Sequence, residues 1–358
     1  MTATARTSND RRGACPGAPS WRDGARVALT CLLLTACARA PVELVFAGPT
    51  MGTTYTVKTI GAGAVTQQEI EERIDAILGT VDLEMSTYRT DSALSRFNES
   101  RSTDWYPVPE ALAQVVAAAQ DISAMTGGAF DVTVGPLVDL WGFGPGGTRD
   151  DLPDDAALSD ARERVGYRLL EVRLDPPALK KQRPDLEVDL NAIVPGYAVD
   201  RIAAELDALD VENYLIDVGG ELRARGRNAQ EQSWRVAVEE PVEGLREVHT
   251  IIRLENAAVA TSGDYRQYFD VDGRRYSHTL DPRTARPVEH GLASVAIVAE
   301  SAMLADALAT ALAVLGPVQG ADFVDRRGLA ALFLVREDGA FVEKSTPGFE
   351  RLRVEGRS

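Results

Sequence analysis

The sequence is poor in the residues and motifs that build common metal and nucleotide sites. Its 358 residues include three cysteines and three histidines, and Cys-x-x-Cys and His-Glu-x-x-His are absent, which argues against a Cys/His metal cluster. No Gly-Lys dipeptide occurs, so a Walker-type P-loop is excluded, and the lack of Gly-x-Ser-x-Gly removes the simplest hydrolase interpretation. The single Gly-x-Gly-x-x-Gly match, at 142–147, has no strand pattern before it and does not indicate a Rossmann turn.

Positive charge is also scarce. The 54 acidic residues outnumber the 38 basic ones, and the formal net charge is −16. Phosphate recognition needs concentrated positive charge, so this balance argues against a nucleic-acid-binding protein. The hydrophobic share of 45% is ample for a buried core, and the length allows one large domain or two ordinary ones.

The apolar run nearest the N-terminus, Val27–Ala36, follows a polar stretch with several arginines. About ten residues at a rise of roughly 1.5 Å cannot cross a hydrocarbon core of about 30 Å, so the run predicts a signal peptide. Leu34-Thr-Ala-Cys37 resembles the bacterial lipobox, in which the cysteine is lipidated and becomes the mature N-terminus. We therefore expect a lipoprotein signal peptide at 1–36 and a folded domain at 37–358. An ordinary signal with a chance cysteine is the alternative.

The rest of the chain mixes helical and alternating patterns. Helical spacing is found at 67–81, 109–125, 197–209 and 303–315. Strand patterns are found at 54–59, 186–190, 214–218, 234–238, 294–298 and 329–335, and Asp-Gly pairs at 272–273 and 338–339 predict hairpin turns. The mixture predicts an α+β fold in a single compact domain, with mixed, mainly antiparallel sheets flanked by helices. The stretch 142–155 is a candidate linker or lid.

Several glycine- or acid-marked segments are candidates for a ligand site. Asp131 follows the paired glycines that end a helix, which indicates either a ligand contact or an ordinary C-cap and turn. The segment 188–200 reads as a strand, a glycine-containing turn and the start of a helix, where backbone N–H groups can bind an anion. His278, beside a serine and near an Asp-Pro turn, is a candidate base or a structural histidine.

Asp306 and Thr310 lie four residues apart in an otherwise apolar helix, so their side-chain oxygens share one face. A buried carboxylate is unfavourable without compensation, and a hard cation would supply it. A buried arginine or the nearby helix N-terminus would also stabilise the charge. The spacing alone leaves these three alternatives open.

Taken in order, these segments resemble the ApbE family, the FAD:protein FMN transferases. The segments that carry the resemblance are Met51-Gly-Thr-Thr-Tyr55, Met85-Ser-Thr-Tyr88, Gly127-Gly-Ala-Phe-Asp131, Asp189–Asp200, Asp217-Val-Gly-Gly-Glu221, Ala260-Thr-Ser-Gly-Asp264, His278–Pro282 and Ala305–Thr310. The resemblance covers about Val45 to Leu334. It implies a compact α+β core related to the T-fold.

The resemblance also implies roles for individual residues. The positions that match flavin-nucleotide contacts are Met51, Tyr88, Ala129, Phe130, Asp131, Asp189, Pro195 and Leu280. Those that match Mg²⁺ ligands are Ala192, through its carbonyl, and the side chains of Asp306 and Thr310, while His278 falls where a catalytic base is expected. Two positions depart from the family pattern. Pro195 replaces a lysine of Ala-Lys-Gly-Tyr and supplies neither charge nor N–H donor, and Ala285 replaces a glycine.

The activity implied by the resemblance is Mg²⁺-dependent transfer of FMN from FAD to a serine or threonine hydroxyl of a target protein, with release of AMP. The implied acceptor is an exported or membrane-bound subunit of a redox complex. With the lipobox, the expected location is the bacterial cell envelope, lipid-anchored at the inner membrane and facing the periplasm. An FAD pyrophosphatase that yields free FMN and AMP, or a flavin-binding lipoprotein without turnover, are the alternatives.

Overall fold

The computed structural model describes residues 42–354, apart from 62, 64, 145–146, 148–150, 243, 245–246, 265–267 and 272–273. The predicted signal peptide, Cys37, the turn at 272–273 and part of the candidate lid lie outside the described residues. The domain boundary at Cys37 therefore stays a prediction.

Helices of very different length are spread along the described chain. They are α1 (Gln67–Met85), α2 (Ala93–Glu99), α3 (Glu110–Met125), α4 (Gly135–Leu140), α5 (Asp155–Glu163), α6 (Val194–Ala208), α7 (Ala302–Arg327) and α8 (Pro347–Glu350), with a short 3-10 turn at Tyr167–Leu169. Several begin with a side-chain cap, as at Ser301, whose hydroxyl accepts the N–H of Leu304 at the start of α7.

Within the described residues, the main sheet contains eight strands, and every neighbouring pair is antiparallel. Its strands, in spatial order, are β1 (Glu43–Thr50), β2 (Thr53–Ile60), β6 (Tyr214–Val218), β7 (Glu221–Arg225), β10 (Ala257–Gly263), β15 (Leu292–Ala299), β16 (Ala330–Glu337) and β17 (Ala340–Ser345). Smaller sheets are formed by β3 (Tyr106–Pro107) with β5 (Pro177–Lys181) and β4 (Leu170–Leu174), by β8 (Trp234–Glu239) with β9 (Val248–Leu254), by β11 (Tyr268–Val271) with β12 (Arg274–Ser277), and by β13 (Leu280–Asp281) with β14 (Arg286–Pro287). The mainly antiparallel α+β prediction is confirmed.

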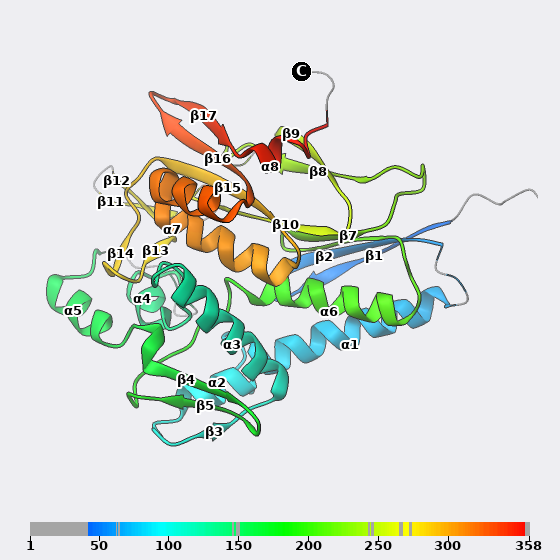
Figure 1. Ribbon diagram of the computed structural model, residues 1–358. Helices are drawn as coiled ribbons and strands as arrows, with labels where there is room; N and C mark the ends of the chain where they lie inside the picture. Colours follow the sequence, from blue (N-terminus) through cyan, green and yellow to red (C-terminus); the bar gives the residue numbers. More distant parts are fainter. Residues whose placement is uncertain are drawn as a thin grey trace, which may run out of the picture. The chain divides into compact units, whose positions relative to one another are not determined.

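The main sheet separates two apolar clusters. Helices α1, α3, α6 and α7 pack with one face of the sheet, and β8, β9 and α8 lie across its other face (Figure 1). Strand β16 shows why, because its side chains alternate between the faces: Phe333 joins the helical side, and Leu332 and Leu334 join the other. The functional candidates on α6 and α7 therefore lie on the helical side of the sheet.

The part of helix α7 before Gly316 is largely apolar and mostly buried. The whole helix is long and apolar enough to cross a membrane by length and composition, but most of its apolar stretch is buried in the protein, as in core helices of other folds. The helix predicted at 303–315 does not end there. Gly316, with φ 74° and ψ −177°, interrupts it, and a second helical segment continues to Arg327. The first segment, before Gly316, carries Asp306 and Thr310.

The strand predicted at 186–190 is wrong. These residues form no strand, although Leu186, Val188 and Leu190 are buried. The side-chain amide of Asn98 replaces a neighbouring strand, since its Nδ2 donates to the carbonyl of Val188 at 2.8 Å and its Oδ1 accepts the Val188 N–H at 2.9 Å. Alternating burial therefore arises here without a sheet ladder.

The other predicted elements occur, with shifted ends. Helix α1 extends beyond 81 to Met85, and α6 begins at Val194, before the predicted start at 197. The turn at 338–339 is confirmed, because Asp338 and Gly339 both have positive φ between paired strands β16 and β17. The relation to the T-fold stays a prediction.

Candidate functional site

Asp306 lies in the second turn of α7 and is 6% exposed. Its Oδ2 accepts the backbone N–H of Gly196, in the first turn of α6, at 3.0 Å. Burial raises the pKa of Asp306 to about 7, and the bond from Gly196 partly opposes that rise. Among the described residues no cationic side chain forms an ion pair with it. The carboxylate is thus stabilised by the N-terminus of another helix and by no arginine.

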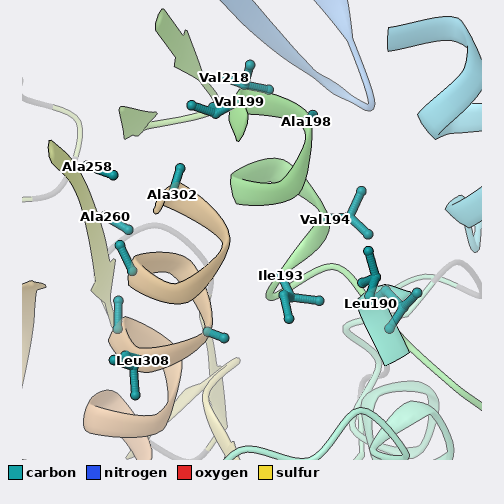
Figure 2. Packing of buried hydrophobic residues seen from close by; sticks show 14 of the residues in the cluster. Leu190, Ile193, Val194, Ala198, Val199, Val218, Ala258, Ala260, Ala302 and Leu308 are labelled. Atoms are coloured by element: carbon teal, nitrogen blue, oxygen red, sulfur yellow. The ribbon is translucent and has the colours of Figure 1, made fainter. Parts of the chain in front are cut away.

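Thr310 lies one turn further along α7, and its Oγ1 is 3.4 Å from Oγ of Ser262 on β10. Ala192 lies two residues before α6 begins, in a tight turn where the N–H groups of Ile193 and Val194 both donate to the carbonyl of Leu190. Because Asp306 contacts the first turn of α6, the three predicted metal ligands come from the same junction. Figure 2 shows this junction, with the start of α6 beside the first turns of α7 and strand β10.

The donor chemistry at this junction fits a hard cation. A carboxylate, a backbone carbonyl and a hydroxyl are oxygen donors, which Mg²⁺ prefers while it keeps waters and substrate phosphates as further ligands. Among the residues that the structure describes, no group of three or more His, Cys, Asp or Glu side chains is placed to hold a metal. A buried carboxylate without a cationic partner is the observation that supports cation binding here.

Asp131 differs from the expectation of a free ligand. Its Oδ1 accepts the backbone N–H and the hydroxyl of Thr133 at 2.8 and 2.7 Å, and its Oδ2 accepts the N–H of Tyr167 at 2.7 Å. Burial nevertheless raises its pKa. Ala129 and Phe130, just before it, are buried after the turn that ends α3. The carboxylate therefore fixes this loop, which corresponds to the turn alternative, and its position as a flavin contact stays a prediction.

Asp189 lines a pocket, and Tyr88 lies close enough to feel its charge. Tyr88 is 65% exposed, and partial burial, followed by the negative charges of Asp189 and Asp139, raises its pKa. The pocket has a volume of about 200 Å³ and is lined by Thr87, Thr90, Ser95, Asn98, Glu99, Gly135, Asp139, Glu187, Val188 and Asp189. Burial also raises the pKa of Asp139, Glu187 and Asp189. The pocket is lined by three acidic residues, Asp139, Glu187 and Asp189, and is large enough for only part of a dinucleotide.

Met51 forms a tight turn with Gly52 at the end of the β1–β2 hairpin. Both residues have positive φ, 44° and 72°, as a two-residue type I′ turn requires. The side chain of Met51 packs against the main apolar cluster. The turn therefore holds Met51 in a fixed position beside the helical side of the sheet.

His278 and Leu280 lie after β12. His278 occupies a bend, is half-buried, and has its ring centroid 6.2 Å from that of Phe143 in an edge-on arrangement. Leu280 is buried in a cluster with Leu137 and Trp141 from α4 and the residue after it. The structure thus places these two residues beside α4 and the residues that follow it.

Comparison with known proteins identifies the family. The sequence profile of the ApbE family matches residues 51–333 of this chain. The chain belongs to the ApbE family. It is 41% identical over 321 residues to the FAD:protein FMN transferase of Salmonella typhimurium, which covers 89% of this chain and 92% of that protein. It is 42% identical over 326 residues to the FAD:protein FMN transferase of Vibrio cholerae, covering 90% and 97%.

Solved ApbE structures have the same fold. The flavin transferase ApbE from Vibrio cholerae superposes with a TM-score of 0.81 at 40% identity, covering 87% of this chain and 99% of that one. The apo form of the Pseudomonas stutzeri flavinyl transferase ApbE also gives 0.81, at 43% identity, with 88% and 98% covered. The fold prediction is therefore confirmed across nearly the whole described chain.

Pro195 departs from the ApbE pattern, and the structure explains why the backbone tolerates it. It is the second residue of α6, where an N–H group has no intrahelical acceptor, so a proline removes no helical hydrogen bond. Its neighbour Gly196 still donates to Asp306. The substitution therefore removes a side chain without disturbing the junction. Ala285 takes the positive φ of 61° expected at a glycine position, so this second departure keeps the turn as well.

Sequence reasoning missed Asp139 and Glu187 as pocket residues. Asp139 lies in the short helix α4, and Glu187 lies in the segment misassigned as a strand. Neither occupies a motif. Glu187 is two residues before Asp189 in the sequence, whereas only the fold brings Asp139 beside them.

Proposed function

We propose that this ApbE protein transfers FMN from FAD to a serine or threonine hydroxyl of a target protein, with Mg²⁺ and with release of AMP. The similarity to the FAD:protein FMN transferases over about nine-tenths of the chain carries the proposal. The buried carboxylate of Asp306, with no cationic partner among the described side chains, supports its metal dependence.

Ala192, Asp306 and Thr310 are the residues that would hold Mg²⁺, through a carbonyl, a carboxylate and a hydroxyl. The cation would supply charge neutralisation for the pyrophosphate of FAD as its bond breaks. The protein's own contribution is to hold Asp306 at the start of α6 through the Gly196 N–H, and Thr310 against Ser262 of β10. Side chains fixed in this way lose little freedom when a ligand binds.

The transfer itself needs an activated hydroxyl. The acceptor oxygen bonds to the phosphorus of the FMN moiety, the bond from that phosphorus to the bridging oxygen breaks, and AMP leaves. A carbon-linked hydroxyl is a poor nucleophile at neutral pH, so a base that takes its proton accelerates the step. We assign this role to His278, because it is a half-buried imidazole in a bend that follows β12.

The flavin nucleotide is proposed to contact Met51, Tyr88, Asp189 and the loop Ala129–Asp131, and also Leu280. The exposed ring of Tyr88 and the pocket lined by Asp189 support contacts with the flavin nucleotide on that side of the molecule. The carboxylate of Asp131 bonds to Thr133 and Tyr167, so it holds the loop in place, and we propose that the backbone of the loop contacts the flavin. Pro195 removes one contact to FAD and no metal ligand.

We also propose that Cys37 is lipidated and that the protein works in the bacterial cell envelope, anchored to the inner membrane and facing the periplasm. The lipobox-like Leu34–Cys37 supports this location. The acceptor would then be an exported or membrane-bound subunit of a redox complex.

The decisive experiment incubates the protein with FAD, Mg²⁺ and an acceptor domain, followed by intact-mass measurement and AMP determination. Transfer makes the acceptor heavier by one FMN residue and releases one free AMP for each FMN transferred. Free FMN and AMP without a mass change would identify a pyrophosphatase, and no AMP at saturating FAD would identify a flavin-binding protein. Either result contradicts the proposed transfer.

A further inference from the structure

Helices α6 and α7 stabilise each other's N-termini through reciprocal caps. Asp306 of α7 accepts the N–H of Gly196 in α6 at 3.0 Å. In return, Asp200 of α6 accepts the N–H of Ala302 on Oδ1 at 3.0 Å and that of Met303 on Oδ2 at 2.9 Å. Each carboxylate thus satisfies orphan donors in the first turn of the other helix.

The two helices meet backbone to backbone at this crossing. A Cβ atom added to Gly196 would lie 2.3 Å from the carbonyl oxygen of Ala302 and 2.8 Å from Cα of Met303. These distances are too short for a side chain, so only glycine permits the approach. The spacing of the helices, and with it the distance from Asp306 to the start of α6, is therefore set at this contact.

A third element fixes the cap. Arg223 of β7 donates to Oδ1 of Asp200 and forms an ion pair with it. The Asp200 side chain is 17% exposed and that of Arg223 is 28% exposed, so the pair is largely shielded from solvent. Arg223 thus anchors Asp200, and through it the first turn of α7, to the main sheet.

We propose that Asp200 is a positioning residue for the cation site and acts through α7. It bonds to the N–H groups of Ala302 and Met303, one turn before Asp306 and two turns before Thr310. Loss of the cap would let the start of α7 move relative to α6 and separate Asp306 and Thr310 from Ala192. This inference rests on the proposed function, because it assumes that these three residues bind Mg²⁺.

The chain provides a matched control on the same helix. Asp207 lies seven residues after Asp200 in α6, and its Oδ1 accepts from Arg225, two residues after Arg223 on β7. The same oxygen accepts a hydrogen bond from the Tyr214 hydroxyl, with 2.9 Å between the two oxygens. Asp207 therefore joins α6 to the sheet in the same manner as Asp200 but bonds to no part of α7.

The test compares Asp200→Asn with Asp207→Asn in the full chain. The concentration of free Mn²⁺ is measured by electron paramagnetic resonance while the protein is titrated with Mn²⁺. The Mg²⁺ concentration for half-maximal AMP release is measured in parallel. Asp200→Asn should weaken Mn²⁺ binding and raise the Mg²⁺ requirement about 10–100-fold. This is the loss of metal affinity typical when a residue that orients metal ligands is substituted. Asp207→Asn should stay within about threefold of wild type, although both variants lower the melting temperature.

Equal effects of the two substitutions, or an unchanged affinity in Asp200→Asn, would overturn the positioning role. If Asp200→Asn does not fold, Arg223→Gln and Arg225→Gln replace the pair, and a weaker affinity in Arg223→Gln alone supports the inference while equal affinities overturn it. A wild-type protein that neither binds Mn²⁺ nor needs Mg²⁺ would instead refute the proposed metal dependence. The two failures are therefore distinguishable.

Discussion

Replacement of Asp306 by asparagine should stabilise the metal-free protein at alkaline pH and abolish its response to Mg²⁺. The asparagine oxygen can still accept the Gly196 N–H, so the shape and the cap are retained while the charge is lost. Burial raises the pKa of Asp306 from 3.8 to about 7, so the folded state binds a proton more tightly than the unfolded chain. The protonated carboxyl therefore favours folding below about pH 4, and this contribution is lost as the pH rises through 7.

The size of the effect follows from the same shift. A rise from 3.8 to about 7 corresponds to at most about 4 kcal/mol of stability lost above pH 7, at roughly 1.4 kcal/mol per pKa unit. In chelator at pH 8, Asp306→Asn should therefore unfold at a urea midpoint about 1 M higher than wild type, for an m-value of roughly 3 kcal/mol/M. At pH 4 the two midpoints should nearly coincide.

Added Mg²⁺ should reverse the order at pH 8. Wild type gains stability from a cation that binds only the folded state, whereas the asparagine variant gains none and releases no AMP. Urea titrations with and without Mg²⁺ at both pH values supply the measurement. An asparagine variant no more stable than wild type in chelator at pH 8, or one still stabilised by Mg²⁺, would refute the reasoning.

Three further outcomes are expected. Pro195→Lys should restore one charged contact worth roughly 1–3 kcal/mol and tighten FAD binding about 5–150-fold with little change in kcat; an unchanged Kd in calorimetry would remove this position from the FAD site. His278→Gln should lower kcat about 10²–10⁴-fold at neutral pH while KM for FAD changes little, and a pH–rate profile that keeps its acidic limb in the variant would exclude His278 as the base. Radiolabelled palmitate should enter wild type but not Cys37→Ser, and labelling that survives the substitution would contradict the lipobox.

Local patterns were sufficient for the elements whose side-chain period matches their burial. The short apolar run at 329–335 predicted β16, whose residues contact the two apolar clusters in turn because both faces of the strand are buried. The helix predicted to end at 315 is only interrupted there, because Gly316 leaves the helical conformation and a second helical segment follows to Arg327. The alternating pattern at 186–190 wrongly predicted a strand, because the side-chain amide of Asn98 takes the place of a neighbouring strand there. The spacing of apolar residues along a short segment cannot reveal a hydrogen-bond partner that lies 90 residues away.

The candidate site divides in the same way. The sequence by itself determined that Asp306 and Thr310 share one face of a helix, because their four-residue spacing is a property of helical geometry. It also determined the family, whose motifs follow one another in order along the chain. Only the tertiary structure showed that the N-terminus of α6 contacts Asp306, because the Gly196 N–H lies 110 residues away in sequence. The cation stays a proposal. The tertiary structure likewise showed that Asp131 bonds inward, since a carboxylate looks the same in a sequence whether its donors come from the protein or from a ligand.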